Sequence, residues 1–244
     1  MTTPEPLVDV RGLTKSYGGR RVIGDVTFRL ARGDVIGLVG ANGGGKTTTL
    51  RMIAGLSRPD SGSGVVLGAD VRRPRPERRR WIGYMGQGLA LYPDLTVAEN
   101  LRFHADAHGL ADPAAGIAAT VSRHGLAGVM DRRVGQLSGG WARRAQFAAS
   151  VLHEPPLLLL DEPTSGLDVA TRRTIWGWIA DFAKAGHGVL VSTHDLVEAQ
   201  FCPAIILYAD GRAHDLATPA ALMSARNVGT LEAVVLASAR GQPS

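Results

Sequence analysis

The chain has 244 residues, of which 45% are hydrophobic, and it carries a formal net charge of +5. This length suits one large α/β domain with a sizeable core, or two small ones, and the hydrophobic fraction is that of an ordinary globular protein. No apolar run approaches the roughly 18 residues that a membrane-spanning helix needs, and Met1–Val10 lacks the basic-then-apolar layout of a secretory signal. These features argue against a membrane-spanning or an exported chain.

Cys202 is the only cysteine, which excludes an intrachain disulfide and suits a reducing compartment. The basic balance could favour nucleic acid or an anionic membrane surface, and Arg72–Arg80 is the clearest basic run. We interpret that run as a solvated loop leading into a strand, with membrane headgroup contact as the sharper alternative. Nucleic acid is less favoured, because no aromatic residue interleaves with the arginines.

The first half of the chain predicts short strands, then one helix, then a helical stretch. Strands are predicted at Val8–Leu13, Arg21–Leu30, Val35–Val39, Gly64–Leu67 and Trp81–Met85, a helix at Thr47–Ala54, and helices through Val97–Leu152 with breaks near Gly109–Pro113 and Asp131–Gln136. The first two strands flank a Gly18–Gly19 turn. The third is an apolar run that ends at a glycine-rich turn, as a buried strand does.

From Leu157 onward the pattern alternates between strand and helix. The predicted order is strand Leu157–Leu160, helix Ala170–Ala185 closed by Gly186, strand Val189–Ser192, helix Leu196–Gln200, strand Ile205–Tyr208 and a tight turn at Asp210–Gly211. Such alternation implies parallel strands covered by helices. The helical middle of the chain is then an insertion between two parts of one α/β sheet.

The segment Gly40–Thr47 reads Gly-Ala-Asn-Gly-Gly-Gly-Lys-Thr and matches the pattern G-x-x-x-x-G-K-[ST] in full. Its glycines let successive backbone N–H groups converge on phosphate oxygens without a clashing Cβ, and the helix that follows directs its positive end at the same anion. In this pattern Lys46 neutralises the β- and γ-phosphates and the Thr47 hydroxyl binds Mg²⁺. The sequence therefore predicts a nucleotide phosphate site.

The run Leu157–Glu162 is an apolar strand that ends in two carboxylates. Such an end lies at the carboxyl edge of the sheet, where ligands bind in open α/β sheets. Asp161 would hold Mg²⁺, directly or through water, and Glu162 could polarise the attacking water as general base. An acidic, solvated strand end is the alternative, and the phosphate loop in the same chain disfavours it.

The segment Leu137–Trp141 reads Leu-Ser-Gly-Gly-Trp and opens a helix. Five residues share one face of that helix at helical spacing: Trp141, Ala145, Ala148, Ala149 and Leu152. Ser138 suits an N-cap, and a Ser-Gly-Gly start exposes N–H groups and a positive dipole end to an anion. Because one nucleotide does not need two such sites from one chain, the second site suggests a nucleotide held mainly by another copy.

Together these segments resemble the nucleotide-binding subunit of ABC transporters, in the family's order and over nearly the whole chain. Gly40–Thr47 is similar to the Walker A loop, Leu157–Glu162 to Walker B, Leu137–Trp141 to the signature sequence and Ser165–Asp168 to the D-loop. Trp141 stands where the family most often has Gln. A tryptophan at this position resembles a subset of bacterial drug-export-type subunits. Ala41 replaces the commoner proline, a change we expect to be harmless.

The resemblance implies an α/β fold: a P-loop NTPase (RecA-like) core with an N-terminal antiparallel β subdomain and an inserted α-helical signature subdomain. It implies one ABC ATPase domain over residues 1–244. The core with its β subdomain would cover 1–88 and 154–215, the helical subdomain 89–153, and a C-terminal tail 216–244.

The family's functional residues carry over onto matching positions. ATP-binding residues are expected at Tyr17, Gly40, Asn42, Gly43, Gly44, Gly45, Lys46, Thr47, Thr48, Gln87, Ser138, Gly139, Gly140 and Asp168; Mg²⁺ is expected at Thr47, Gln87 and Asp161, and catalysis at Glu162 and His194. Tyr17 would stack on adenine, and Gln87 would sense Mg²⁺ and the γ-phosphate near the transmembrane partner. His194 would steady the γ-phosphate, and Asp168 would couple two sites.

The resemblance predicts a head-to-tail pair that holds two MgATP and hydrolyses them. It implies an energy subunit on the cytoplasmic face of the inner membrane, peripheral to it, that powers export of a drug-like, lipid or other hydrophobic cargo through a separate transmembrane permease. The partners would be that permease and a second copy or a homologous ATPase subunit, with no nucleic acid expected.

Three alternatives stay open: an importer's energy subunit, a non-transport ABC ATPase of translation or DNA repair, and a catalytically dead module. Lys46, Glu162 and His194 argue against the last. Leu231–Val235 only loosely resembles the ending of drug-exporter subunits, and no regulatory domain follows in this sequence. The pair His104 and His108 has the i, i+4 spacing of some zinc helices, but Ala105 stands where a metalloprotease has glutamate, so we interpret the pair as incidental.

Overall fold

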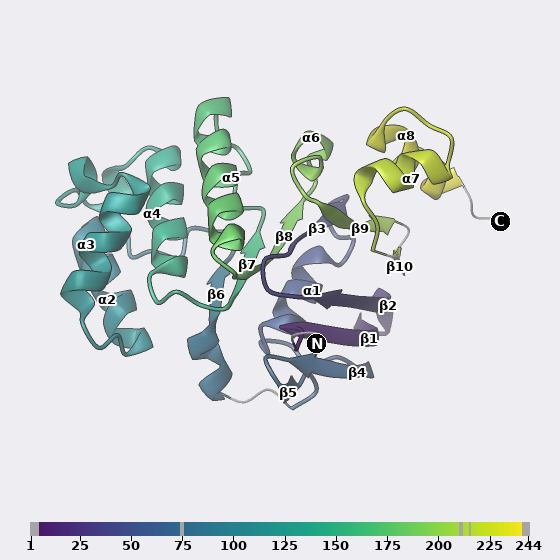
Figure 1. The fold of residues 1–244 in the computed structure, drawn as a ribbon, viewed down its shortest axis with the longest axis horizontal. Helices are drawn as coiled ribbons and strands as arrows, with labels where there is room; N and C mark the ends of the chain where they lie inside the picture. The colour runs from purple at the N-terminus through teal and green to yellow at the C-terminus, as the bar shows by residue number, and fades with distance from the viewer. Residues whose placement is uncertain (1–4, 74–75, 210–211, 215, 241–244) are drawn as a thin grey trace.

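Two β-sheets organise the chain, and each takes strands from separate stretches of the sequence (Figure 1). The computed structural model describes residues 5–73, 76–209, 212–214 and 216–240. The predicted turn at Asp210–Gly211 lies outside these residues. Among the described residues, none of the helices combines the length and apolar character needed to pass through a bilayer.

The first sheet is antiparallel and has the strand order β2-β1-β4-β5. Its strands are β1 (Val8–Tyr17), β2 (Arg20–Leu30), β4 (Ser61–Val66) and β5 (Ala69–Asp70). β1 runs four residues beyond the predicted end at Leu13. The prediction ended too early because register shifts interrupt the pairing of β1 with both of its neighbours. Such bulges break the alternation of buried and exposed residues by which a strand is recognised in a sequence.

The second sheet has the order β10-β9-β3-β8-β7-β6 and is parallel from β9 to β6. Its strands are β3 (Val35–Gly40), β6 (Ile82–Met85), β7 (Leu157–Asp161), β8 (Gly188–Thr193), β9 (Ala204–Ala209) and β10 (Arg212–Ala213). Every residue of β3, β7 and β8 is buried. Both faces are covered, which explains why these strands appear in the sequence as continuous apolar runs.

Helices cover the two faces of this parallel sheet. The helix α1 (Lys46–Ile53) packs on one face in a core shared with the antiparallel sheet. On the other face lie α5 (Val169–Lys184), α6 (Leu196–Ala199), α7 (Pro219–Ala225) and α8 (Leu231–Arg240). The sequence reasoning left α7 and α8 unassigned within the tail, although Thr218 caps α7 and a proline opens it.

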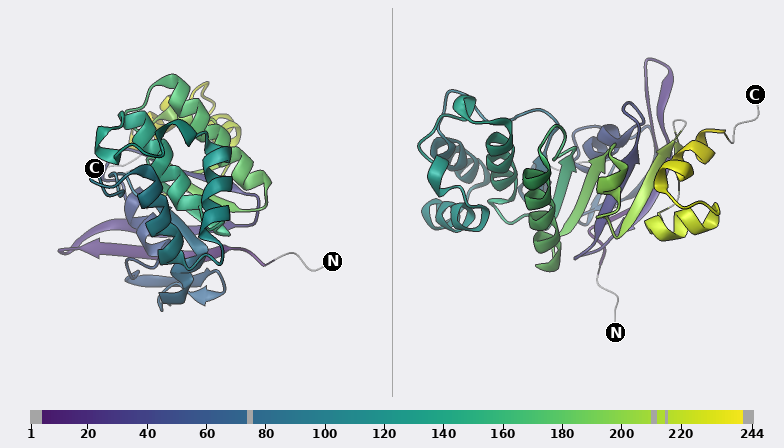
Figure 2. Two further views of the ribbon diagram at one scale, coloured as in Figure 1. Left: turned by 90° about the vertical axis from the view of Figure 1, so that its left-hand side faces the viewer. Right: turned by 90° about the horizontal axis from the view of Figure 1, so that it is seen from above.

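The inserted helical region has a core of its own. It contains α2 (Val97–His108), α3 (Pro113–His124) and α4 (Gly139–Val151), with 3₁₀ turns η2 (Ala127–Val129) and η3 (Val134–Gln136); a further turn, η1 (Pro76–Trp81), precedes β6. The three α-helices start at side-chain caps from Thr96, Asp112 and Ser138. Figure 2 shows this region at one end of the parallel sheet and α7 with α8 at the other.

Candidate functional site

A glycine-rich loop joins the carboxyl end of β3 to α1. Gly40 has φ 152°, and a Cβ there would overlap the carbonyl oxygen of Tyr208. Gly45 has φ 101°, and a Cβ there would lie 2.9 Å from the carbonyl oxygen of Val22 on β2. Both ends of the loop therefore require glycine, which leaves backbone N–H groups exposed for an anion.

Lys46 opens α1 and is only 4% exposed. Its Nζ donates to the carbonyl oxygens of Gly40 (2.7 Å) and Ala41 (3.0 Å), and lies 3.9 Å from the Glu162 Oε1. Burial lowers the pKa of the Lys46 ammonium from its ordinary value, and the carboxylates of Glu162 and Asp161 oppose that shift. The cation is thus held inside the loop that a phosphate would occupy.

Asp161 ends β7 beside the first turn of α1. The Thr47 Oγ1 donates to its Oδ1 at 3.0 Å, and the Ser192 Oγ donates to the same oxygen at 2.6 Å. Ser192 pairs with Asp161 in the register of β7 and β8. Carboxylate and hydroxyl oxygens at this separation are a donor set that suits Mg²⁺.

Glu162 is 6% exposed and has a left-handed backbone with φ 49°. Its amide N–H faces the Ser192 Oγ at 3.0 Å. Its Oε2 lies 3.3 Å from the Gln87 Nε2 and 3.1 Å from the His194 Nδ1. Since a non-glycine residue adopts this φ at a cost of about 1–3 kcal/mol, the surrounding contacts fix the carboxylate against backbone strain.

The carboxyl ends of β3, β7, β8 and β6 bring the central residues to one edge of the sheet. The structure brings together Lys46, Thr47, Gln87, Asp161, Glu162 and His194. His194 follows β8 with its side chain 46% exposed, so it faces both the carboxylate and solvent. This clustering is what parallel strand ends produce in an open α/β sheet.

Arg143 belongs to this site, although the sequence analysis did not single it out. Its guanidinium donates to the carbonyl oxygens of Glu162 (2.8 Å) and Gly86 (3.1 Å), and to the Gln146 side chain. It is buried, and it links α4 to the segment that carries Gln87 and to the end of β7. An Arg and a Gln three positions apart on an inward helix face are the one sequence signal that could have revealed it.

A second polar network supports the segments after β7 and β8. The buried Glu198 accepts hydrogen bonds from the hydroxyls of Thr164 (2.6 Å) and Thr193 (2.8 Å). The Arg172 guanidinium lies 3.2 Å from Glu198 and 2.8 Å from Asp195. These residues hold the Ser165–Asp168 segment against the segment that carries His194, and sequence reasoning missed them because the network spans 34 residues.

The two remaining predicted segments meet at a different place. Ser138 caps α4 through the Trp141 N–H (3.5 Å), and Asp168 caps α5 through the Thr171 N–H (2.9 Å) and Oγ1 (2.7 Å). A Cβ on Gly140 would lie 3.2 Å from the Thr171 hydroxyl, so the two helix starts adjoin. Within the described chain, no hydrogen bond or ion pair links them to Lys46, and Ser138 and Gly139 are exposed.

Tyr17 ends β1 and is 49% exposed. Its hydroxyl lies 3.3 Å from the Ser57 Oγ, and the Lys15 ammonium lies 5.5 Å from its ring centre. None of these contacts involves the glycine-rich loop. The rest of the predicted loop residues, Asn42, Gly43, Gly44 and Thr48, lie on the loop and on the first turn of α1, with Asn42 and Gly43 exposed.

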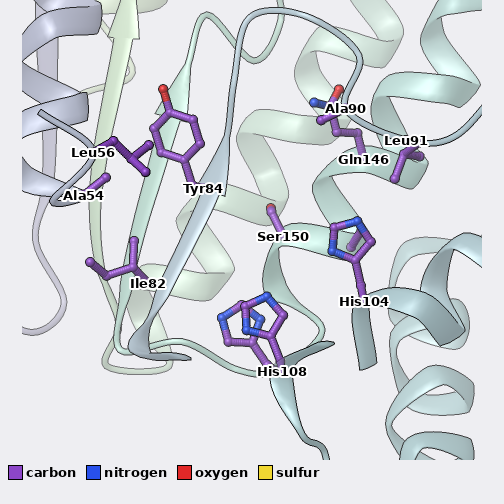
Figure 3. Close-up of a pocket in the computed structure, with 12 residues that line it drawn as sticks. Ala54, Leu56, Ile82, Tyr84, Ala90, Leu91, His104, His108, Gln146 and Ser150 are labelled. Atoms are coloured by element: carbon purple, nitrogen blue, oxygen red, sulfur yellow. The ribbon is translucent and has the colours of Figure 1, made fainter. Parts of the chain in front are cut away.

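A pocket of about 270 Å³ lies between the helical region and β6, and Ala90 and Leu91 of the segment after β6 line it. Figure 3 shows Tyr84 and Ile82 of β6 on one side and His104 and His108 of α2 on the other. The His108 ring stacks on His153 with centroids 3.6 Å apart. No group of three or more His, Cys, Asp or Glu side chains in the described chain is arranged to hold a metal ion.

Comparison with known proteins shows which family this chain belongs to. A family model described as ABC transporter matches residues 23–165, which include the loop, Gln87 and Glu162. The chain is 38% identical over 220 residues to the probable multidrug ABC transporter ATP-binding protein YbhF of Escherichia coli K12, covering 89% of this chain but only 38% of that protein. It is 36% identical to the Nod factor export ATP-binding protein I of Paraburkholderia xenovorans, covering 91% of this chain and 74% of that protein.

Solved structures agree with the fold. A structure of an ATP-binding subunit of an ABC transporter superposes with a TM-score of 0.85 at 28% identity, covering 96% of this chain and all of that one. The dimer of the ATP-binding cassette MJ0796 with ADP and Pi gives a TM-score of 0.79 at 26% identity, covering 86% and 98%. The expected P-loop NTPase fold with its antiparallel and helical additions is thereby confirmed.

Proposed function

The chain belongs to the ABC transporter family, and from this premise we propose that it is the ATP-hydrolysing subunit of a transporter whose membrane-spanning part is a separate permease. The observation that carries the proposal is the buried Glu162 carboxylate, which lies within 3.9 Å of Lys46 and 3.1 Å of His194. A fixed carboxylate beside a phosphate-binding cation is what water activation next to a γ-phosphate needs.

The loop would hold the phosphates of ATP through its backbone N–H groups and through the start of α1. Lys46 would exchange its hydrogen bonds to the loop carbonyls for phosphate oxygens. Thr47, Asp161 and Gln87 would hold Mg²⁺, which neutralises phosphate charge when bound. The oxygens of Thr47 and Asp161 already lie 3.0 Å apart, so their positions fit that cation.

Glu162 would accept a proton from the attacking water, and His194, next to that carboxylate, would steady the γ-phosphate. The hydrogen bond from Gln87 to Glu162 ties the carboxylate to the segment after β6, which borders the pocket of Figure 3. A change at the γ-phosphate would thus reach a groove between the sheet and the helical region. We propose this groove as the place where the motion passes to the permease.

A second copy would complete each site. Ser138 and Gly139 begin α4 at an exposed position, with their N–H groups and dipole open to an anion that Lys46 of the same chain does not reach. MJ0796, similar to this chain over 98% of its length, is described as a dimer bound to ADP and Pi. We propose a head-to-tail pair in which Ser138–Gly140 of one copy contacts ATP on the other, with Asp168 at the junction.

We further propose a site at the cytoplasmic face of the inner membrane and an exported, hydrophobic cargo. The names of the similar proteins, one for multidrug transport and one for Nod factor export, support the direction. We also propose the division into a core with β subdomain (1–88, 154–215), a helical subdomain (89–153) and a tail (216–244), which the two sheets and the separate core of the helical region support. Adenine stacking on Tyr17 belongs to this proposal as well.

The test is phosphate release by the purified chain, together with size-exclusion chromatography in MgATP. Glu162→Gln should bind ATP, elute as a dimer and lose about 10²–10⁴ in turnover, because the general base is gone. Adding Ser138→Arg to Glu162→Gln should abolish the dimer and leave ATP binding by each copy. Unchanged turnover in Glu162→Gln, or an ATP-dependent dimer in the double variant, would contradict the proposal.

A further inference from the structure

A second large pocket lies far from the nucleotide loop. It has a volume of about 580 Å³, within the range of small-molecule sites. It is lined by α5, by the residues that lead into β3, and by the segment between α6 and β9. Val35, at the amino end of β3, belongs to its wall, whereas Gly40 and the phosphate loop are at the carboxyl end of the same strand. The pocket therefore plays no part in the proposed hydrolysis.

Its walls are apolar and aromatic. α5 and α6 cover the same face of the parallel sheet (Figure 1), and Ile179 and Ala183 of α5 form part of the wall next to Val35. The rings of Trp176 and Phe201 lie 5.5 Å apart, and Phe201 is 51% exposed. An exposed aromatic ring at the mouth of an apolar hollow offers contact area to a ligand.

Trp176 carries a polar group with no partner. The residue is 6% exposed, and its indole Nε1 makes no hydrogen bond within the described chain. Buried indole N–H groups usually find an acceptor, because leaving one unpaired is unfavourable. Trp176 therefore places a buried, unpaired donor in the wall of this pocket.

Gly177 is a second unexplained feature of the same wall. It lies in the middle of α5, where glycine is less favourable than alanine. A Cβ at this position would meet nothing within 4 Å, so no packing within the chain requires glycine there. The missing side chain leaves open space along the helix on the pocket side.

The charges on the pocket wall are positive. Arg173 and Lys184 line it, and no Asp or Glu does. Arg173 is one turn before Gly177, is exposed, and has no hydrogen bond or ion pair among the described residues. Lys184 is about 16 Å further along the helix axis and already lies 3.5 Å from Asp181. The free cation is therefore at the end of the pocket that holds Trp176.

We propose that this pocket binds an amphipathic organic anion, such as a carboxylate with an apolar tail. The carboxylate would lie at Arg173, at the end of the pocket that holds the aromatic rings of Trp176 and Phe201. The tail would extend over Gly177 toward Ala183, against the apolar wall. The assignment concerns a site separate from the ATP site and goes beyond the proposed function.

The test is isothermal titration calorimetry of the full chain with sodium decanoate, below the concentration at which it forms micelles. Saturable one-to-one binding is expected in the wild type. Gly177→Leu fills the open space with a good helix former and should weaken binding at least about tenfold. Gly128→Leu is the matched control, since a Cβ there also meets nothing within 4 Å and Gly128 lies in η2, away from the pocket; it should bind like the wild type.

A second pair of variants tests the charge. Arg173→Gln should weaken decanoate several-fold and remove its advantage over the neutral analogue decanol, whereas Lys184→Gln should change little. Phosphate release without decanoate should be equal in all four variants, which separates this site from the proposed ATPase. Absence of saturable binding in the wild type, or wild-type affinity in both Gly177→Leu and Arg173→Gln, would overturn the proposal.

Discussion

Two glycine-rich helix starts in this chain differ in how the rest of the molecule surrounds them. The loop before α1 is enclosed: Gly40 and Gly45 abut backbone carbonyls of β9 and β2, and Lys46 is buried beside Glu162. The start of α4 is open: Gly139 has nothing within 4 Å of a Cβ, and Ser138 is exposed.

The difference indicates which site is complete in one chain. Around α1, one copy supplies every group of the site: the glycine-rich loop, the Lys46 ammonium, the Thr47 hydroxyl and the carboxylates of Asp161 and Glu162. Around α4, the described residues supply a cap and an open helix dipole, whereas the buried Lys46 belongs to the other site. An open half-site of this kind has a use only when a second surface covers it, which is why the proposed pair rests on this contrast.

The largest effect is expected where glycine is enclosed. Gly45→Ala places a Cβ at φ 101° and against the Val22 carbonyl, so we expect a loss of about 1–3 kcal/mol in the free energy of unfolding and a fall of about 10²-fold or more in hydrolysis, as when a phosphate-facing donor is displaced. Gly139→Ala, the matched change at the open start, should leave the free energy of unfolding within about 0.5 kcal/mol. Urea denaturation of both variants checks this, and equal destabilisation would refute the contrast.

The next effect separates binding from pairing. Ser138→Asp keeps an N-cap residue on α4 but puts a carboxylate where the phosphates of the partner's ATP would lie. We expect hydrolysis to fall about 10²-fold, with the affinity of a single copy for a fluorescent ATP analogue unchanged. Ser122→Asp, on the exposed end of α3, is the control. A loss of single-copy affinity would mean that Ser138 serves the ATP of its own chain.

A smaller effect is expected at Arg143, which joins α4 to the enclosed site. Arg143→Lys cannot maintain the fork to the Glu162 and Gly86 carbonyls, and the loss of about 1.4 kcal/mol in positioning corresponds to a tenfold fall in kcat. KM should stay constant, because Arg143 does not contact the loop. Arg144→Lys, whose side chain stacks on Trp141 and Trp178, should leave kcat unchanged. A shift in KM alone would contradict the positioning role.

The smallest effect concerns His153, just beyond the other end of α4. Burial, then the neighbouring His108, lowers its pKa to about 3, so the folded protein keeps it neutral. The unfolded chain takes up the proton below about pH 6.5. The stability that comes from keeping His153 neutral is thus fully present above pH 6.5 and is lost progressively as the pH falls toward 3. The loss at pH 5, relative to neutral pH, is about 1–2 kcal/mol in the free energy of unfolding. Urea denaturation at pH 7 and 5 should show a shallower fall for His153→Phe, and equal slopes would disprove the assignment.

Much of the fold follows from the sequence because its strongest signals are physical necessities. The buried strands β3, β7 and β8 are continuous apolar runs, and the loop before α1 has glycine where a side chain would clash. The five residues predicted to share one face of the helix after Ser138 lie in one core: Ala145, Ala148, Ala149 and Leu152 are buried, with Trp141 packed beside them. The clustering of Lys46, Asp161 and Glu162 followed from the rule that strand ends share an edge.

What escaped prediction depends on register and on distance. Ser192 reaches Asp161 only because β7 and β8 pair in one particular alignment, and no local pattern fixes that alignment. Glu198 receives its hydrogen bonds from threonines in two other segments. Asp168 was expected to couple two sites, and the structure adds that it caps α5, so any variant there changes a helix end as well.

The left-handed backbone of Glu162 has a consequence for how this protein can be improved. A residue with φ 49° is held in a conformation that glycine adopts freely and glutamate does not. Selection for heat resistance alone would therefore favour replacing the proposed general base, and a thermostable descendant obtained without a turnover screen would tend to be inert. Thermal stability and turnover thus place opposite demands on the residue at position 162.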